Sequence, residues 1–130
     1  MTLKSRANDW LKQSKNDLSW SKLGLENNFY SQSCFTAQQA GEKAIKAIAY
    51  FLDFEVRGHS ITKIAQGLKI NGEIEEAGKF LDLFYISARY PDALPAGAPF
   101  EMFTKAQAEM AIKSAELIIQ RAIAEIETHD

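Results

Sequence analysis

Apolar residues recur every three to four positions along most of the chain, which is the spacing of one face of an α-helix. This pattern predicts long helices over about 3–23, 31–53 and 103–127. The apolar positions are Ala7, Trp10, Leu11, Leu18 and Leu25 in the first helix, Cys34, Ala37, Gly41, Ile45, Ile48 and Leu52 in the second, and Ala108, Ile112, Ala115, Ile119, Ala122 and Ile126 in the last. No stretch indicates a pair of strands or an internal repeat.

Two further helices are predicted between the second and the last. A short one spans about 60–68, with Ser60 as its N-cap. The other follows the break at Asn71-Gly72, begins with acidic residues in its first turn, and ends near Arg89, where a cation favours the helix dipole. Its apolar side consists of Phe80, Leu81, Leu83, Phe84 and Ile86. A loop with all three prolines, Pro91, Pro95 and Pro99, then leads into the last helix.

These elements predict an all-α fold, an up-and-down bundle of four long helices and one short helix in a single domain over 1–130. Small residues line one side of the second helix, namely Ala37, Ala40, Gly41 and Ala44. Small side chains let a neighbouring helix approach closely, so we expect the second helix to lie at the centre of the bundle.

The net charge of the chain excludes few classes of function. The net charge of −2 gives no general attraction to nucleic acid or to an anionic membrane. Residues 1–70 hold 10 basic and 6 acidic residues, whereas 71–130 hold 5 and 11, so a phosphate-binding surface is expected to draw on the first half.

Cys34 has no partner for an intrachain disulfide, and no leader or uninterrupted apolar run is present. We therefore expect a cytoplasmic protein without a membrane span. Cys34 is interpreted as a small packed residue, the alternative being a reactive thiol.

The most informative segment for function is Arg89-Tyr90-Pro91-Asp92. Proline disfavours a helical conformation in the residue before it, so Tyr90 is expected to be extended and Arg89 to lie in the last turn of its helix. A guanidinium, an aromatic ring and a carboxylate are then close together, as in a small anion-binding site. The structural alternatives are that Arg89 binds the last carbonyls of its helix, pairs with Asp92, or lies at an interface.

Two other groups of polar residues are candidates. Gln39, Lys43, Lys46 and Tyr50 share one side of the second helix, as either a solvated face or a phosphate- or partner-facing stripe. His59 precedes Ser60 at the start of the short helix, where free backbone N–H groups favour an anion; it is either a turn residue or a ligand donor and general base. No His or Cys cluster predicts a metal site, and no glycine-rich phosphate loop is present.

Three blocks of sequence together resemble the HEPN domain family. They are the segment 34–47 with Ala37-Gln38-Gln39-Ala40-Gly41-Glu42-Lys43, then Gly58-His59-Ser60-Ile61, then Ala88-Arg89-Tyr90-Pro91-Asp92. The resemblance implies an α-helical bundle that commonly forms a homodimer and is proposed to bind nucleotides. It also implies a nucleotidyltransferase-domain partner, in a pair that behaves as toxin and antitoxin, and no cofactor.

The resemblance also implies a possible activity, because some HEPN proteins are metal-independent ribonucleases. Those proteins use an Arg followed, after four to six residues, by a His on the last helix. This sequence departs from that motif, because seven residues separate Arg121 from His129. A separation of eight positions rotates the two side chains about 80° apart on a helix.

Two hypotheses follow from the resemblance. In the first, the protein is not an enzyme but binds ATP or GTP and its partner. The phosphate ligands would then be Arg89, Lys43, Lys46, His59, Ser60 and Gln39. Tyr90 would stack on the base, and Asp92 would orient Arg89 or accept from a ribose hydroxyl. In the second, it is a ribonuclease toxin that acts on RNA, with His59 or His129 as general base and Arg89 or Arg121 stabilising the phosphorane.

Overall fold

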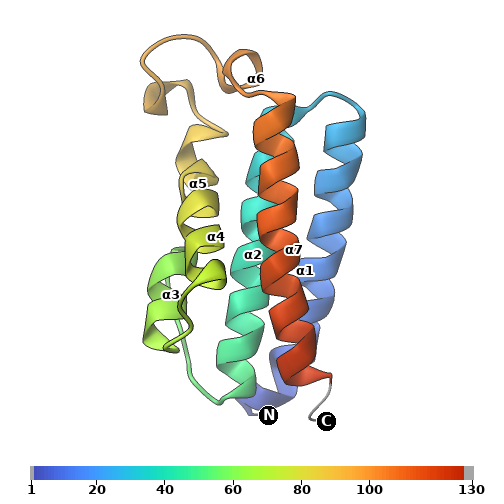
Figure 1. Cartoon of the computed structure of the whole chain (residues 1–130), viewed down its shortest axis with the longest axis vertical. Coiled ribbons are helices and arrows are strands. Elements are labelled where there is room, and N and C mark those ends of the chain that lie inside the picture. Colours follow the sequence, from blue (N-terminus) through green and yellow to red (C-terminus); the bar gives the residue numbers. More distant parts are fainter. Residues whose placement is uncertain (1, 128–130) are drawn as a thin grey trace.

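The computed structural model describes residues 2–127, whose regular structure is entirely helical (Figure 1). The elements are α1 (Leu3–Glu26), α2 (Tyr30–Phe51), α3 (Ile61–Gly67), α4 (Glu73–Asp82), α5 (Phe84–Ser87), the 3-10 turn η1 (Pro91–Ala93), α6 (Pro99–Met102) and α7 (Lys105–Ile126). The predicted all-α class is confirmed.

The helices form the predicted up-and-down bundle. In Figure 1, α1 and the α4–α5 segment run in one direction, α2 and α7 run in the other, and α3 packs beside α4. Helix α2 contacts every other α-helix of the bundle, so it is the central helix, as its small residues predict. None of the helices in residues 2–127 is both long and apolar enough to span a membrane.

Close packing at α2 depends on Gly41. A Cβ atom placed on Gly41 would lie 2.8 Å from Leu81 Cδ1, 3.2 Å from Ile61 Cδ1 and 3.3 Å from Ile118 Cδ1. All three side chains are fully buried. Helices α3, α4 and α7 therefore meet α2 where α2 has no side chain.

The helix predicted from 73 to 89 is interrupted, which corrects its expected extent. Helix α4 ends at Asp82 and α5 ends at Ser87. Between them the N–H of Leu83 donates to the carbonyl of Phe80, three residues back, so the helix tightens locally. Leu83 and Ile86, predicted to be on the apolar side of this helix, are 67% and 48% exposed, whereas Leu81 and Phe84 are buried.

Tyr90 is extended, with φ −125° and ψ 127°, as the following proline predicts. Arg89 lies just beyond α5 rather than inside a helical turn, although its N–H still donates to Ile86 O. The loop that follows carries η1 and α6 over the end of the bundle (Figure 1).

Replacing Gly41 by Ala should lower the free energy of unfolding by about 1–3 kcal/mol, because the added methyl group overpacks a core whose neighbours cannot move into solvent. Urea denaturation followed by circular dichroism measures the change. Gly67→Ala is the matched control, since a Cβ there meets nothing within 4 Å; it should be neutral or stabilising. An equal loss in both variants would contradict the packing argument.

Candidate functional site

Arg89 is held by the helix that it follows. Its Nε and Nη2 donate to the carbonyl of Tyr85 at 2.9 and 2.6 Å. Its guanidinium carbon lies 4.2 Å from the centre of the Phe35 ring, 4.8 Å from that of Tyr85 and 5.0 Å from that of Tyr90. The backbone carbonyl and the rings fix the guanidinium, and Nη1 has no hydrogen-bond partner within residues 2–127.

His59 contacts the same tyrosine. Its ring stacks on Tyr85 with centroids 4.6 Å apart and an interplanar angle of 18°. His59 Nδ1 lies 3.2 Å from Glu42 Oε2. Because an ionised carboxylate only accepts hydrogen bonds, Nδ1 carries a proton, and in the neutral ring Nε2 is left as the acceptor. The side chain of His59 is 56% exposed, whereas that of Glu42 is 6% exposed.

Glu42 is the centre of a buried polar cluster, which we call the Glu42 cluster: Gln38, Glu42, Lys46 and His59. Lys46 Nζ donates to Glu42 Oε2 at 2.8 Å, and Gln38 Nε2 donates both to Glu42 Oε1 and to the carbonyl of His59, each at 3.3 Å. The side chains of Lys46 and Glu42 are only 10% and 6% exposed. The cluster joins α2 to the segment that precedes α3.

The N-terminus of α3, a predicted anion site, is filled by the protein's own carboxylate. Asp82 accepts hydrogen bonds from the N–H groups of Ile61 and Thr62 at 2.9 and 3.0 Å, and from the hydroxyl of Thr62 at 2.7 Å. Ser60 is the N-cap, as predicted, and its hydroxyl also donates to Asp82. The first amides of this short helix are therefore already hydrogen-bonded to Asp82 and are not available to an external phosphate.

The stripe on α2 is not a row of free cations. Lys43 pairs with the buried carboxylate of Asp17 on α1, while Lys46 belongs to the Glu42 cluster. Gln39 donates to Gln38 Oε1 at 2.7 Å. The charge of both lysines is thus neutralised inside the protein.

Tyr90 and Asp92 lie on the surface, and Tyr90 is 51% exposed. Within residues 2–127 no ion pair joins Asp92 to Arg89. Arg121 pairs with Glu125 one turn later on α7, at 3.0 Å. His129 lies outside the described residues.

Sequence reasoning missed three residues that organise this region: Glu42, Asp82 and Tyr85. The helical spacing of Glu42 and Lys46 predicts only a surface pair, and Asp82 and Tyr85 lie inside a predicted helix without a motif. An acidic residue on the apolar side of a central helix was the available signal for Glu42, because a carboxylate there requires partners.

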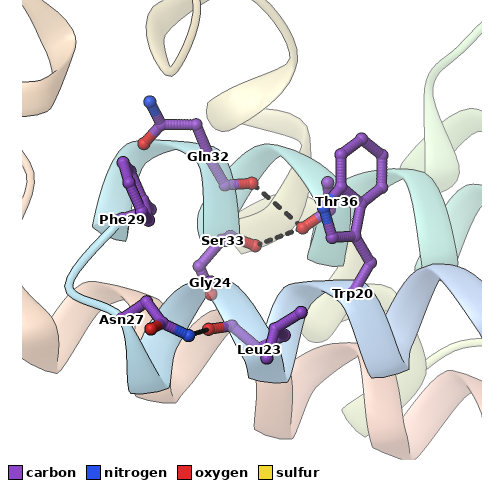
Figure 2. Close-up of a pocket in the computed structure, with 8 residues that line it drawn as sticks. All are labelled: Trp20, Leu23, Gly24, Asn27, Phe29, Gln32, Ser33 and Thr36. Atoms are coloured by element: carbon purple, nitrogen blue, oxygen red, sulfur yellow. Dashed lines mark hydrogen bonds between the residues drawn. The ribbon is translucent and has the colours of Figure 1, made fainter.

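Two adjoining surface pockets, which we call the first hollow and the cleft, lie at the end of the bundle near Arg89. The first, of about 270 Å³, lies between α1 and the start of α2; Figure 2 shows Trp20 and Phe29 at its opposite ends. The second is a cleft of about 340 Å³ that shares Trp20, Gln32 and Thr36 with the first. It reaches Arg89 and α6.

No group of three His, Cys, Asp or Glu side chains among residues 2–127 is arranged to hold a metal ion. Cys34 is buried, and burial raises the pKa of its thiol to about 12. The thiol therefore stays protonated at neutral pH, which favours the packed interpretation over the reactive one.

The fold and site define a small helical bundle with a buried glutamate that is paired with a lysine, and an arginine that is held by aromatic rings just beyond α5. The HEPN domain family model matches residues 7–126. The chain therefore belongs to the HEPN domain family.

Solved structures agree with this assignment. TT1696 from Thermus thermophilus is 35% identical, with a TM-score of 0.88 over 92% of this chain and 98% of that one. The archaeal HEPN homologue ST0689 is 35% identical, with a TM-score of 0.83 over 93% and 98%. An HEPN domain protein from Thermotoga maritima is 29% identical, with a TM-score of 0.73 over 94% and 99%.

A relative in Methanocaldococcus jannaschii carries the name "Putative toxin MJ1304". It is 27% identical over 124 residues, which cover 85% of this chain and 82% of the relative.

Replacing Glu42 by Gln should lower the free energy of unfolding by about 3 kcal/mol, because Lys46 then remains buried without its counter-charge. Thermal and urea denaturation measure the loss. Adding Lys46→Met to this variant should restore part of it. Glu125→Gln, which breaks the exposed pair with Arg121, is the matched control and should cost less than about 1 kcal/mol. Equal effects of Glu42→Gln and Glu125→Gln would show that the Glu42 cluster does not hold the fold together.

Proposed function

We propose that this protein is the HEPN component of a toxin–antitoxin-like pair with a nucleotidyltransferase-domain protein, and that it binds a nucleotide through Arg89. The similarity to a relative named as a toxin supports the toxin-like role. Cytoplasmic localisation and a homodimer belong to the same proposal. Co-purification with a nucleotidyltransferase encoded beside this protein, and the mass of the complex, test the partner and the stoichiometry.

The main observation that supports nucleotide binding is the set of contacts that hold the Arg89 side chain. Two of its nitrogens are committed to Tyr85 O, and its plane is held against Phe35, so little side-chain entropy remains to be lost on binding. Its remaining N–H groups suit a phosphate oxygen, and charge-assisted hydrogen bonds of this kind are strong. The exposed ring of Tyr90 adjoins the guanidinium and offers a stacking surface.

The buried ion pairs narrow the set of phosphate ligands. The sequence pattern predicts that Lys43 and Lys46 add positive charge to the phosphate site, but Asp17 and Glu42 already neutralise them. The hydroxyl of Ser60 likewise already donates to Asp82. The proposal therefore rests on Arg89, whose guanidinium contacts the Tyr90 ring, and Asp92 is exposed. His59 contacts the Tyr85 ring, as Arg89 does.

Homodimer formation is supported by the apolar surface. Large apolar side chains are exposed on several elements within the described residues, including Trp20 on α1, Leu83 between α4 and α5, and Leu117 on α7, at 64%, 67% and 43%. A homodimer would remove such side chains from water where they lie side by side.

A ribonuclease is the second candidate function, and the contact between Glu42 and His59 favours it. A buried carboxylate at 3.2 Å orients the imidazole and leaves Nε2 as a proton acceptor on the surface. Arg89 and His59 both contact the Tyr85 ring, so an anion-binding group and a base lie in the same region. Arg121 is already paired with Glu125.

Titration with ATP and GTP should give dissociation constants below millimolar, and Arg89→Ala should weaken binding at least about tenfold through loss of the charge-assisted hydrogen bonds. Isothermal calorimetry measures the affinity. Arg121→Ala removes the same charge from an exposed position and should leave binding unchanged. The nucleotide role fails if Arg89→Ala keeps full affinity and only lowers the melting temperature.

Incubation of the purified protein with single-stranded RNA in chelator should leave the RNA intact if the protein only binds nucleotides. Gel analysis over several hours measures cleavage, with Lys113→Ala, which removes an exposed cation of α7, as the control variant. Cleavage that disappears in His59→Ala, which truncates a side chain that is 56% exposed, would establish the ribonuclease instead, because this change removes the base.

A further inference from the structure

The cleft beside Arg89 is built from four separate elements. Its lining residues come from α1, α2, the Ala88-Arg89 segment just beyond α5, and α6. None of the three sequence blocks that resemble the HEPN family includes Trp20 or Phe100, so this cleft is a product of the tertiary structure.

Aromatic rings stand at the edge of this cleft with most of their surface in water. Trp20 is 64% exposed and Phe100 is 70% exposed. Phe35, half-buried in the wall, packs against the guanidinium of Arg89. Flat apolar surfaces beside a cation suit a planar ring that carries a negative group.

The polar groups of the cleft are few, and most of them have partners. Thr36 Oγ1 donates within α2 (Figure 2), and Ser31 Oγ donates to Gln32 Oε1 at 3.0 Å. That bond orients the Gln32 amide and leaves its Nε2 without a partner among residues 2–127. Within residues 2–127, Gln32 Nε2, Arg89 Nη1 and the indole N–H of Trp20 have no hydrogen-bond partner, so all three can donate to a ligand.

We propose that this cleft binds the base of a single unpaired nucleotide, with Trp20 and Phe100 as stacking surfaces, Gln32 donating to a base-edge acceptor, and Arg89 binding the phosphate. The inference rests on the proposed nucleotide binding and places the base against Trp20 and Phe100 rather than on Tyr90, which does not line the cleft. A volume of about 340 Å³ is at the small end of the range for ligand sites, which fits one nucleotide and not a duplex.

The test compares AMP with ribose 5-phosphate, which lacks the base, by calorimetry at low salt. AMP should bind about tenfold more tightly than ribose 5-phosphate, and Trp20→Ala and Phe100→Ala should each remove most of that difference, because base stacking on an aromatic side chain contributes about this much. Neither variant should weaken ribose 5-phosphate. The protein has two tryptophans, so the indole N–H signals in an NMR spectrum give a second readout: AMP should shift that of Trp20 and not that of Trp10.

Phe29→Ala is the matched control. Phe29 is 55% exposed and lines only the first hollow, so its loss should leave AMP affinity unchanged. An equal loss in Phe29→Ala and Phe100→Ala would overturn the location. If AMP and ribose 5-phosphate bind alike while Arg89→Ala weakens both, the base site fails but phosphate binding stands. If neither ligand binds and Trp20→Ala changes the oligomeric mass, the cleft is a protein interface: nucleotide binding and the base site both fail, whereas the proposed homodimer stands.

Discussion

The buried carboxylate of Glu42 is the constraint on which the functional region depends. An isolated ionised carboxylate inside a bundle is strongly unfavourable, so Lys46, Gln38 and His59 must all be placed around it. These contacts fix the segment before α3 against the middle of α2. His59 then stacks on Tyr85, whose carbonyl and ring hold Arg89. One buried charge on the central helix thus positions the surface arginine through a short series of direct contacts.

A second carboxylate shapes the same region from the other side. Asp82 is the last residue of α4, and it binds the first amides of α3. The helix tightens at the next residue, and the chain continues as α5 to Arg89. Asp82 therefore ties the start of α3 to the end of α4, and it also removes α3 from the set of phosphate sites. Of the predicted phosphate ligands Lys43, Lys46, Ser60 and Arg89, the first three are bound to carboxylates of the protein, and Arg89 is not.

Most of the fold could be predicted from sequence because helical periodicity and helix-end residues are local signals. The extended conformation of Tyr90 follows from Pro91, the N-cap Ser60 follows from its side chain, and the central place of α2 follows from Gly41 and its small neighbours. The break at Leu83 could not be predicted in this way, because the apolar pattern continues through it. The assignment of Lys43 and Lys46 as free cations also lacked the necessary information, since Asp17 lies on another helix.

By itself, the sequence determined the all-α bundle, the order of its helices and the three blocks that resemble the HEPN family, because each depends on residues close together in the chain. The tertiary structure alone decided which polar residues are free. It buried Lys46 with Glu42, filled the α3 amides with Asp82, and brought Trp20, Phe35, Arg89 and Phe100 to one cleft. The physical reason is that pairing, burial and cleft formation depend on distances between helices, which residue order along one helix does not specify.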